Sequence, residues 1–512
     1  MEHTFYVTTP IYYVNDVPHI GHAYSTVVAD VLARYHRLSG DDVFFLTGTD
    51  EHGQKVAKAA KVKGLEPQAH VDQMVSPFKD LWSLYNISND SFIRTTEDRH
   101  QTVVQKIFQK LFDQGDIYKG VYEGWYCVHE ETFWPEKQLK NEMCPECNRP
   151  VEWVKEDSYY FKTSKYKKLL LKHIEANPRF IRPEVRRNEV VSFLSEDLQD
   201  IAVSRTTMSW GVPVPFDDAH VVYVWFDALI NYLTGVGYLQ NDDQFSRFWP
   251  PVHIIGKDIL KFHAVIWPSM LMALGIQLPS TIIATGFWTL GEKKISKSRG
   301  NVIDAAELAD ELSDDAVRYF LLREVPLGQD GEFTHKALVR RMNHDLANDF
   351  GNLIHRTLPM IERYRDGRVP AAVTSRNLTS GLAADVEDTI NIFSKSMADL
   401  DPRAALTQIW KMFSTANKFI DQCAPWKLKA DGRDAELDEV LWGLAETIRI
   451  AALLTAPFMP TTSAKIFEQL GLDVKPEEQP YQDFLKWGGL TEQPRIKPGA
   501  PLFPRVEIET QD

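Results

Sequence analysis

The chain of 512 residues contains only four cysteines and no apolar run approaching the roughly 20 residues that a membrane helix needs. So few cysteines exclude a disulfide framework and favour a reducing compartment. Residues 1–14 hold no basic stretch followed by an apolar core, which is the pattern of a secretory signal. We therefore expect a cytoplasmic protein without a membrane span.

Basic residues are fewer than acidic ones, 57 against 71, which gives a net charge of −14. This balance does not exclude a nucleic-acid partner, because such binding depends on a local basic surface. Apolar residues at 44% and charged residues at 25% exclude disorder or a collagen-like fold as a description of the whole chain.

Short apolar runs in the first half of the chain have the β-branched and aromatic composition of buried strands. They lie at residues 5–8, 43–46, 221–226, 252–255 and 281–284. Helical patterns such as 23–38 and 259–274 separate several of them. This alternation predicts a parallel α/β sheet.

Glycine and polar residues follow these runs, for example in residues 47–53, at Asp227 and in residues 256–258. Ligands of open α/β sheets bind beyond the carboxyl ends of the strands. Turns also favour glycine and aspartate for local reasons. The repeated coincidence nevertheless favours a binding site at this edge of the sheet.

The alternation stops between Tyr118 and about Pro215, a stretch that carries three of the cysteines and looks like an inserted small domain. From Leu338 onward, apolar residues recur at helical spacing, as they do in 406–420 and 441–454, which predicts an α-helix bundle. Residues 480–512 are rich in glycine and proline, and we expect them to be extended.

Residues 18–22, Pro-His-Ile-Gly-His, stand between the first strand and a helix expected to begin near Ala23. A helix N-terminus offers unpaired N–H groups to a phosphate. His19 and His22 would lie on one side of the first turn, where both imidazoles can bind phosphate oxygens, while Gly21 lets a base or ribose approach. Chance remains a rival for so short a motif.

A second motif, Lys-Lys-Ile-Ser-Lys-Ser at residues 293–298, has the composition of a mobile basic loop. Its ammonium groups can neutralise charge on a leaving polyphosphate. No glycine-rich P-loop precedes it. Taken alone, it would be an exposed basic loop.

Together the two motifs resemble the signatures of class I aminoacyl-tRNA synthetases, and other segments resemble the methionine-specific branch of that family. These segments are residues 8–15, 48–53, 224–228, 255–259 with His263, and 423–427. The resemblance runs from about Thr4 to Pro504. It differs from the family pattern at Ile295, which replaces a methionine, and at Leu229, where some relatives carry proline.

The resemblance implies a Rossmann-like parallel-sheet catalytic domain, split by an inserted knuckle domain and followed by an all-α anticodon-binding domain. We expect the chain to divide as follows: 1–117, first half of the catalytic domain; 118–215, inserted connective domain; 216–290, second half; 291–337, basic loop and connecting domain; 338–479, anticodon-binding domain; 480–512, extended C-terminal segment.

The resemblance also implies a methionine site and an ATP site. Methionine would contact Ile11, Tyr13, Asp50, Trp225, Ala228, Leu229, Tyr232, Asp258 and His263, with its ammonium on Asp50. ATP would contact His19, Gly21, His22, Lys294, Ser296, Lys297 and Ser298. An aromatic lining suits a thioether, although Trp225 and Tyr232 could equally be plain core residues.

In the implied reaction, methionine and ATP give methionyl-adenylate and pyrophosphate, and the 3′-terminal ribose of tRNA(Met) then takes the methionyl group. Catalysis rests on alignment and charge neutralisation by His19, His22, Lys294 and Lys297, with Mg²⁺ on the phosphates.

The cysteines Cys127, Cys144 and Cys147 suggest an incomplete zinc site, since a closed structural site needs four ligands. Zinc-bearing relatives have a cysteine where this chain has Glu130. His129 or Glu130 could complete the set; the alternative is a degenerate knuckle held by packing.

The resemblance places Asn352, Arg356 and Trp426 at anticodon-recognition positions. Packing against a helix is the alternative role of Trp426. A chain without a further C-terminal domain favours a monomer.

Two other functions remain open. A synthetase for leucine, isoleucine or valine would need a larger editing insertion, and one for cysteine would need thiols in the catalytic core. A catalytically silent tRNA-binding or scaffold protein is the third hypothesis, against which the intact His19, His22, Lys294 and Lys297 argue.

Overall fold

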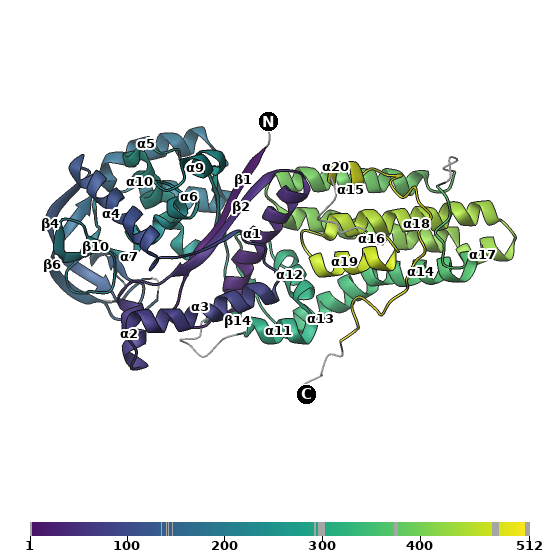
Figure 1. Cartoon of the computed structure of the whole chain (residues 1–512), viewed down its shortest axis with the longest axis horizontal. Helices are drawn as coiled ribbons and strands as arrows, with labels where there is room; N and C mark the ends of the chain where they lie inside the picture. Colours follow the sequence, from purple (N-terminus) through teal and green to yellow (C-terminus); the bar gives the residue numbers. More distant parts are fainter. Residues whose placement is uncertain are drawn as a thin grey trace.

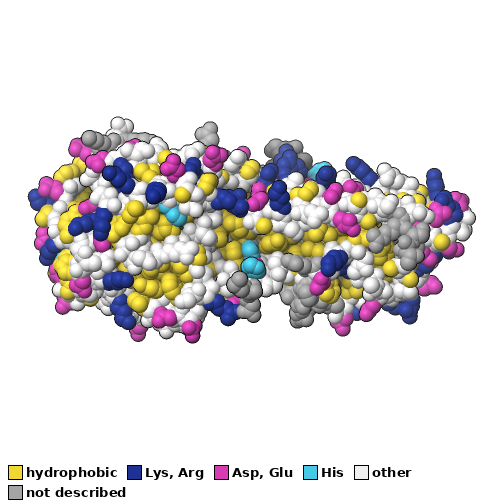
Figure 2. Space-filling model, turned by 90° about the horizontal axis from the view of Figure 1, so that it is seen from above, with side chains coloured by type: hydrophobic (Ala, Val, Ile, Leu, Met, Phe, Trp, Pro, Cys, Tyr) yellow, Lys and Arg dark blue, Asp and Glu magenta, His cyan; other side chains and the backbone are white. Residues whose placement is uncertain are grey.

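The computed structural model describes residues 3–134, 136–139, 141, 143–145, 147–290, 293–294, 303–372, 377–473 and 481–506. These residues form an elongated molecule in which an α/β lobe and a helical lobe lie side by side along the long axis (Figure 1). On the face seen in Figure 2, basic and acidic side chains are interspersed over both lobes. None of the described helices combines the length and the apolar composition that crossing a bilayer requires.

A six-stranded parallel sheet forms the centre of the α/β lobe, with the strand order β3-β2-β1-β12-β13-β7. Its strands are β1 (Thr4–Tyr13), β2 (Asp42–Asp50), β3 (Ser91–Arg94), β7 (Ile181–Arg182), β12 (Val252–Gly256) and β13 (Thr281–Thr285). The sheet is built outward from β1 in both directions, so the strand order reverses between β1 and β12. That reversal leaves a crevice at the carboxyl ends of these two strands.

Helices cover this sheet. They are α1 (Ile20–Leu38), α2 (Gln54–Val62), α3 (Pro67–Leu84), α4 (Asp98–Asp113), α8 (Asn231–Gly235), α9 (Asp242–Phe248) and α10 (Trp267–Leu274). Helix α1 packs against β1, β2 and β12. Its residues Val27, Val28, Val31 and Leu32 are fully buried. Burying one such side chain contributes about 1.5–3 kcal/mol to the stability of the fold.

The segment predicted as an insertion, residues 118–215, contributes most strands of two small antiparallel sheets. One has the order β5-β4-β6-β8 and the other β10-β11-β9. The second of these sheets also includes β11, which lies after the predicted boundary and pairs with β9 and β10. Their elements are β4 (Ile117–Cys127), β5 (Thr132–Trp134), β6 (Glu152–Phe161), β8 (Ile201–Ala202), β9 (Ser204–Arg205), β10 (Pro213–Val214) and β11 (Asp217–Val222), with helices α5 (Thr163–Ala176) and α6 (Glu184–Ser195). One strand from this segment, β7, also joins the edge of the parallel sheet beside β13.

The prediction of a strand at residues 221–226 is wrong. Strand β11 ends at Val222 and is antiparallel to β9 and β10, while residues from Val224 onward form the helix α7 (Val224–Leu229). The run is apolar throughout and buried almost completely, so it lacks the alternation that distinguishes a strand from a buried helix. Asp227, predicted to follow a strand, consequently lies within a helix.

Other boundaries also shift. Helix α1 begins at Ile20 rather than near Ala23. The helix predicted at 259–274 is a 3-10 turn (η2, Lys257–Ile259), a π-helical turn (η3, Phe262–Ile266) and α10. In the C-terminal segment, predicted to be extended, the described residues include the helical turn α20 (Tyr481–Phe484).

The helical lobe confirms the predicted bundle. It consists of η5 (Met342–Gly351), α14 (Asn352–Arg365), α15 (Ser380–Ala398), α16 (Pro402–Cys423), α17 (Pro425–Ala430), α18 (Asp434–Thr455) and α19 (Pro460–Gln469). Between the lobes lie β14 (Trp288–Leu290), β15 (Lys293–Lys294), β16 (Gly331–Glu332), α11 (Ala305–Leu312), α12 (Asp314–Arg323) and α13 (His335–Arg341).

A buried ion pair connects the lobes. Arg318 on α12 donates to Asp30 on α1 at 2.7 Å, and both side chains are inaccessible to solvent. Arg318 also donates to the carbonyls of Tyr85 and Phe458, so one guanidinium joins the sheet lobe to the bundle. Burial opposes ionisation of Asp30, but Arg34 and Arg318 outweigh it and hold the pKa at about 2.

Candidate functional site

A cavity of about 400 Å³ lies at the crevice where the strand order reverses. Its walls come from the ends of β1 and β12, the start of α1, the turn after β2, α7 and the segment after β13. Twelve residues predicted to bind methionine or ATP line it: Ile11, Tyr13, His19, Gly21, His22, Asp50, Trp225, Ala228, Leu229, Tyr232, Asp258 and His263. The structure thus brings together residues that are far apart in the sequence.

The two histidines form the N-terminal cap of α1. His19 is the N-cap residue, and its Nδ1 accepts from the Gly21 amide at 3.1 Å. His22 Nδ1 accepts from the His19 amide, also at 3.1 Å, and the two rings stack with their centroids 3.9 Å apart. With Nδ1 accepting, a neutral imidazole carries its proton on Nε2. Both rings are therefore donors, and no acidic side chain stands in the first turn.

Gly21 cannot be replaced without disturbing this cap. A Cβ at this position would lie 2.9 Å from Cε1 of His19, closer than such atoms approach one another. The glycine that was expected to admit a ligand therefore also makes room for an imidazole.

Asp50 lies at the end of β2, in register with Tyr13 at the end of β1. Its carboxyl group is 2% exposed, and no group among the described residues donates to its Oδ1. Burial, together with the charges of Asp227, Glu131 and Glu51, raises the pKa of Asp50 well above the usual value. A cation that binds beside this carboxyl group would favour its ionised form and release its proton.

Aromatic rings form the adjacent wall. Trp225 stacks on Phe262 with ring centroids 3.9 Å apart, and Tyr13 meets Trp225 edge-on at 6.1 Å. This arrangement offers an apolar side chain or a thioether both surface and polarisable contacts.

The polar side chains of His263 and Tyr232 also line the cavity, and hydrogen bonds fix their orientation. His263 Nδ1 lies 3.0 Å from the carbonyl of Ile259, and its Nε2 lies 2.7 Å from the Tyr232 hydroxyl. Burial lowers the pKa of His263 to about 4, so the ring is neutral at pH 7. Because a carbonyl can only accept, Nδ1 carries the proton, and Tyr232 therefore donates to Nε2.

The second motif begins beside the same cavity. Phe287 and Trp288 line the cavity, and Thr289, the next residue of β14, pairs with Lys294 in β15. The side chain of Lys294 and the residues Ser296, Lys297 and Ser298 lie outside the described residues.

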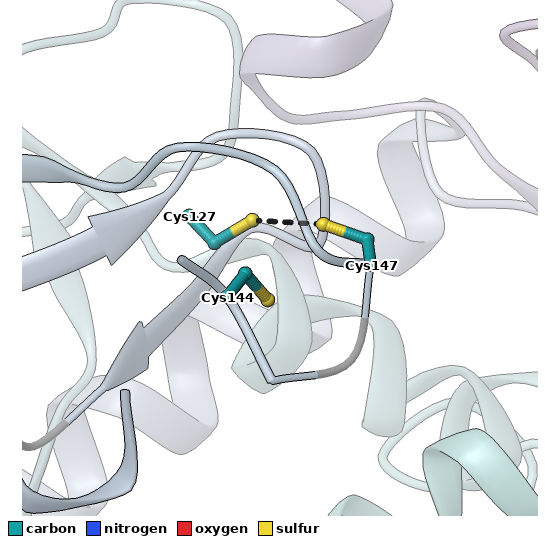
Figure 3. A group of neighbouring side chains, drawn as sticks. All are labelled: Cys127, Cys144 and Cys147. Atoms are coloured by element: carbon teal, nitrogen blue, oxygen red, sulfur yellow. Dashed lines mark hydrogen bonds between the residues drawn. The ribbon is translucent and has the colours of Figure 1, made fainter. Parts of the chain in front are cut away.

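The three cysteines predicted as metal ligands lie together. All are buried, and their sulfur atoms lie within 4.8 Å of one another. Sγ of Cys127 faces Sγ of Cys147 at 3.6 Å, with Cys144 beside them (Figure 3). A second group of three, His129, Glu130 and Cys147, satisfies the same distance limit and lines the cavity. The cysteine cluster therefore meets the cavity wall at Cys147.

The residues predicted to recognise an anticodon lie in the helical lobe. Asn352 and Arg356 stand one turn apart on α14, where Asn352 bonds Asn417 at 3.0 Å and Arg356 pairs with Asp421. Trp426 on α17 is 45% exposed.

Sequence reasoning missed several lining residues, notably Lys55, Arg149, Asn231 and Trp288. Asn231 is 1% exposed, and its Oδ1 has no hydrogen-bond partner within the described part of the chain. Asn231 and Trp288 each lie within six residues of a predicted position, but nothing in their own sequence pattern marks them.

Comparisons with known proteins agree with this geometry. The sequence model for class I tRNA synthetases (M) matches residues 5–152 and 148–358, and that for the anticodon binding domain of methionyl tRNA ligase matches residues 369–507. The methionine–tRNA ligase of Caldanaerobacter subterraneus subsp. tengcongensis is 50% identical, over 100% of this chain and 80% of the relative. That of Bacillus subtilis is 47% identical, over 99% and 79%.

Solved structures give the same result. Mycobacterium tuberculosis methionyl-tRNA synthetase in complex with methionyl-adenylate has a TM-score of 0.94 at 42% identity, over 99% of this chain and 100% of that one. The free state of that enzyme has a TM-score of 0.88 at 39% identity, over 99% of each chain. This chain belongs to the methionyl-tRNA synthetases, a branch of the class I aminoacyl-tRNA synthetases.

Proposed function

We propose that methionine is ligated to tRNA(Met) in this cavity. This ligation is the activity of the family to which the chain belongs. The observation that carries the proposal is the meeting, in one cavity, of a helix N-terminus with two histidine donors, a buried carboxyl group and an aromatic wall.

The ATP phosphates bind at the start of α1. The Nε2–H groups of His19 and His22 donate to phosphate oxygens, and the positive end of the helix dipole adds to the attraction. Gly21 admits the nucleoside. Lys294, Ser296, Lys297 and Ser298 form the second sequence motif, and its two ammonium groups can neutralise the leaving pyrophosphate. Mg²⁺ enters with ATP as part of the substrate.

Methionine binds across the cavity from ATP. Its ammonium group pairs with Asp50 beside the backbone of Ile11, and its thioether lies among Tyr13, Trp225, Ala228, Leu229, Tyr232 and His263. Asp258 supplies a second acidic group at the end of β12. Because His263 is neutral, it places no charge beside the thioether.

The reaction has two steps. A carboxylate oxygen of methionine attacks the α-phosphorus of ATP, forming methionyl-adenylate, and pyrophosphate leaves. A hydroxyl group of the terminal tRNA ribose then attacks the methionyl carbonyl carbon, and AMP leaves. His19, His22, Lys294 and Lys297 align the phosphates and offset their developing charge, and no enzyme side chain becomes covalently attached.

The helical lobe reads the anticodon. Trp426 presents an exposed ring on which an unstacked base can lie, while Asn352 and Arg356 offer amide and guanidinium groups to base edges. Their contacts with Asn417 and Asp421 fix the two side chains on the surface of α14.

The cysteine cluster fits a zinc ion. Tetrahedral zinc with Zn–S bonds of about 2.3 Å separates two sulfur atoms by roughly 3.8 Å, close to the 3.6 Å between Cys127 and Cys147. The amide of Glu130 donates to Sγ of Cys127 at 3.4 Å, a bond that favours a thiolate. Cys127, Cys144 and Cys147 would hold the metal, with His129 or Glu130 as fourth ligand. Less than about 0.2 equivalent of zinc in purified protein would contradict this proposal.

We also propose the domain division at residues 117, 215, 290, 337 and 479, together with a cytoplasmic monomer. Strand β4 begins at Ile117 and α13 at His335, close to two of these boundaries. Sedimentation at two protein concentrations tests the oligomeric state.

Charging of tRNA tests the function itself. The protein should attach methionine to tRNA(Met) and should not attach cysteine, leucine, isoleucine or valine. Binding of tRNA(Met) without charging would favour the alternative, a catalytically silent tRNA-binding relative.

A further inference from the structure

A cluster of three buried ionisable side chains lies outside the cavity. Asp227 Oδ2 is 2.7 Å from His52 Nδ1, and Asp227 Oδ1 is 2.9 Å from His100 Nε2. The exposed fraction of each side chain is 4% or less. None of the three residues lines the cavity, so none can touch a substrate there.

The cluster joins separate elements. Asp227 lies on α7, His52 in the turn after β2 and His100 on α4. The second nitrogen of His100 lies 3.1 Å from the Thr234 hydroxyl on α8, which fixes the orientation of that ring. The Asp227 carboxylate is thus held at both oxygens, by elements that are not neighbours in the sequence.

Two of these elements carry parts of the cavity wall. Asp50 is the last residue of β2 and stands two residues before His52, which lies in the turn that follows. Trp225, Ala228 and Leu229 surround Asp227 on α7, which is only six residues long. A shift of the carboxylate therefore moves the acidic and aromatic walls relative to each other.

The chemistry of the cluster makes this link rigid. Burial opposes ionisation of Asp227, but the charges and hydrogen bonds of His52 and His100 outweigh it and hold the pKa at about 2. Removing one partner from such a buried group leaves an uncompensated charge or an unmade hydrogen bond, which is costly.

We propose that Asp227, held by His52 and His100, is a positioning residue of the amino-acid site: it fixes the turn after Asp50 against α7, so that the ammonium site and the aromatic wall keep the spacing that one amino acid requires. This inference rests on the proposed function of the cavity as the methionine site. The hydrogen bonds and ring contacts described for His52, His100 and Asp227 do not involve residues 19–22, so ATP binding at the start of α1 should not depend on the cluster.

The test is methionine-dependent ATP–pyrophosphate exchange with the full-length protein. Asp227→Asn should raise KM for methionine at least tenfold and leave KM for ATP within about twofold. The matched control is Glu439→Gln, because Glu439 is also a buried carboxyl group, 4% exposed, but accepts its hydrogen bonds from Leu378 and Thr379 in the helical lobe. The control should leave both KM values unchanged even if it lowers the melting temperature.

A second pair of variants keeps the test decisive if Asp227→Asn does not fold. The amide of glutamine can replace Nε2 of His100, so His100→Gln should behave like the unmodified protein, whereas His100→Leu should raise KM for methionine. Unchanged KM for methionine in His100→Leu, or equal rises in both KM values, would overturn the proposal. If the unmodified protein shows no methionine-dependent exchange, the proposed function fails first and this inference fails with it.

Discussion

The carboxylate of Glu131 accepts a hydrogen bond from the backbone amide of Lys55, with Oε1 and N 3.0 Å apart. Glu131 comes from the turn between β4 and β5, and Lys55 lies in the first turn of α2, directly after the turn that follows Asp50. Helix α2 has no side-chain cap at its own N-cap residue, Gly53. Glu131, from the segment that carries the cysteines, thus caps the N-terminus of α2 in the catalytic lobe.

This contact explains the glycine at position 53 and predicts the effect of replacing it. Gly53 has a φ of +102°, and a Cβ there would lie 2.7 Å from Oε1 of Glu131. Gly64 also has a positive φ, +67°, but has nothing within 4 Å of the same position. We expect Gly53→Ala to lower the free energy of unfolding by about 1–3 kcal/mol and Gly64→Ala by about 1 kcal/mol. Urea unfolding measures both; equal losses would contradict the role of Glu131.

The role of His19 as the N-cap of α1 can be separated by mutation from its proposed role as a hydrogen-bond donor to phosphate. Serine is a good N-cap, and its short side chain stays close to the backbone amides that it caps. His19→Ser should therefore keep α1 intact while removing the Nε2 donor to phosphate. We expect kcat for pyrophosphate exchange to fall about 100-fold, the usual effect of losing one such donor, with little change in melting temperature. Retention of full kcat would show that the imidazole does not act on ATP.

Trp426 should matter for tRNA and not for amino-acid activation. Loss of one stacked base costs about 1–3 kcal/mol, so Trp426→Ala should lower kcat/KM for charging about 10- to 100-fold and leave exchange intact. Trp153 on β6 is 52% exposed and provides the control, since Trp153→Ala removes a similar ring far from the helical lobe. Equal losses of charging and exchange in Trp426→Ala would contradict anticodon recognition.

Methionine binding should depend on pH through Asp50. Burial and the charge of Asp227 raise its pKa, so below that pKa the free carboxyl group holds a proton that the substrate's ammonium must displace. The dissociation constant for methionine should therefore fall as the pH rises through the raised pKa of Asp50. Calorimetry in two buffers of different ionisation enthalpy should show proton release, which Asp50→Asn should abolish. A dissociation constant independent of pH would contradict the ionisation change.

The patterns of apolar residues are enough to predict the parallel sheet and the helical lobe, as in β12 and α16. The family resemblance, and no periodic pattern, predicts twelve of the thirty residues that line the cavity as methionine or ATP contacts. The sequence could not predict α7, since residues 221–226 are apolar on every side. It also could not predict the pairing of His52 and His100 with Asp227, or the cap that Glu131 provides, because these contacts join residues between 76 and 175 positions apart. Such contacts depend on the final packing and leave no local signal.

Methionine-dependent ATP–pyrophosphate exchange, compared between the unmodified protein and Lys297→Ala, tests the central claim most directly. The claim is that the histidines of α1 and the lysines of the basic loop act on a single ATP. We expect exchange that requires methionine and falls at least 100-fold in the variant, with KM for methionine nearly unchanged. No exchange in the unmodified protein, or full exchange in the variant, would contradict the account.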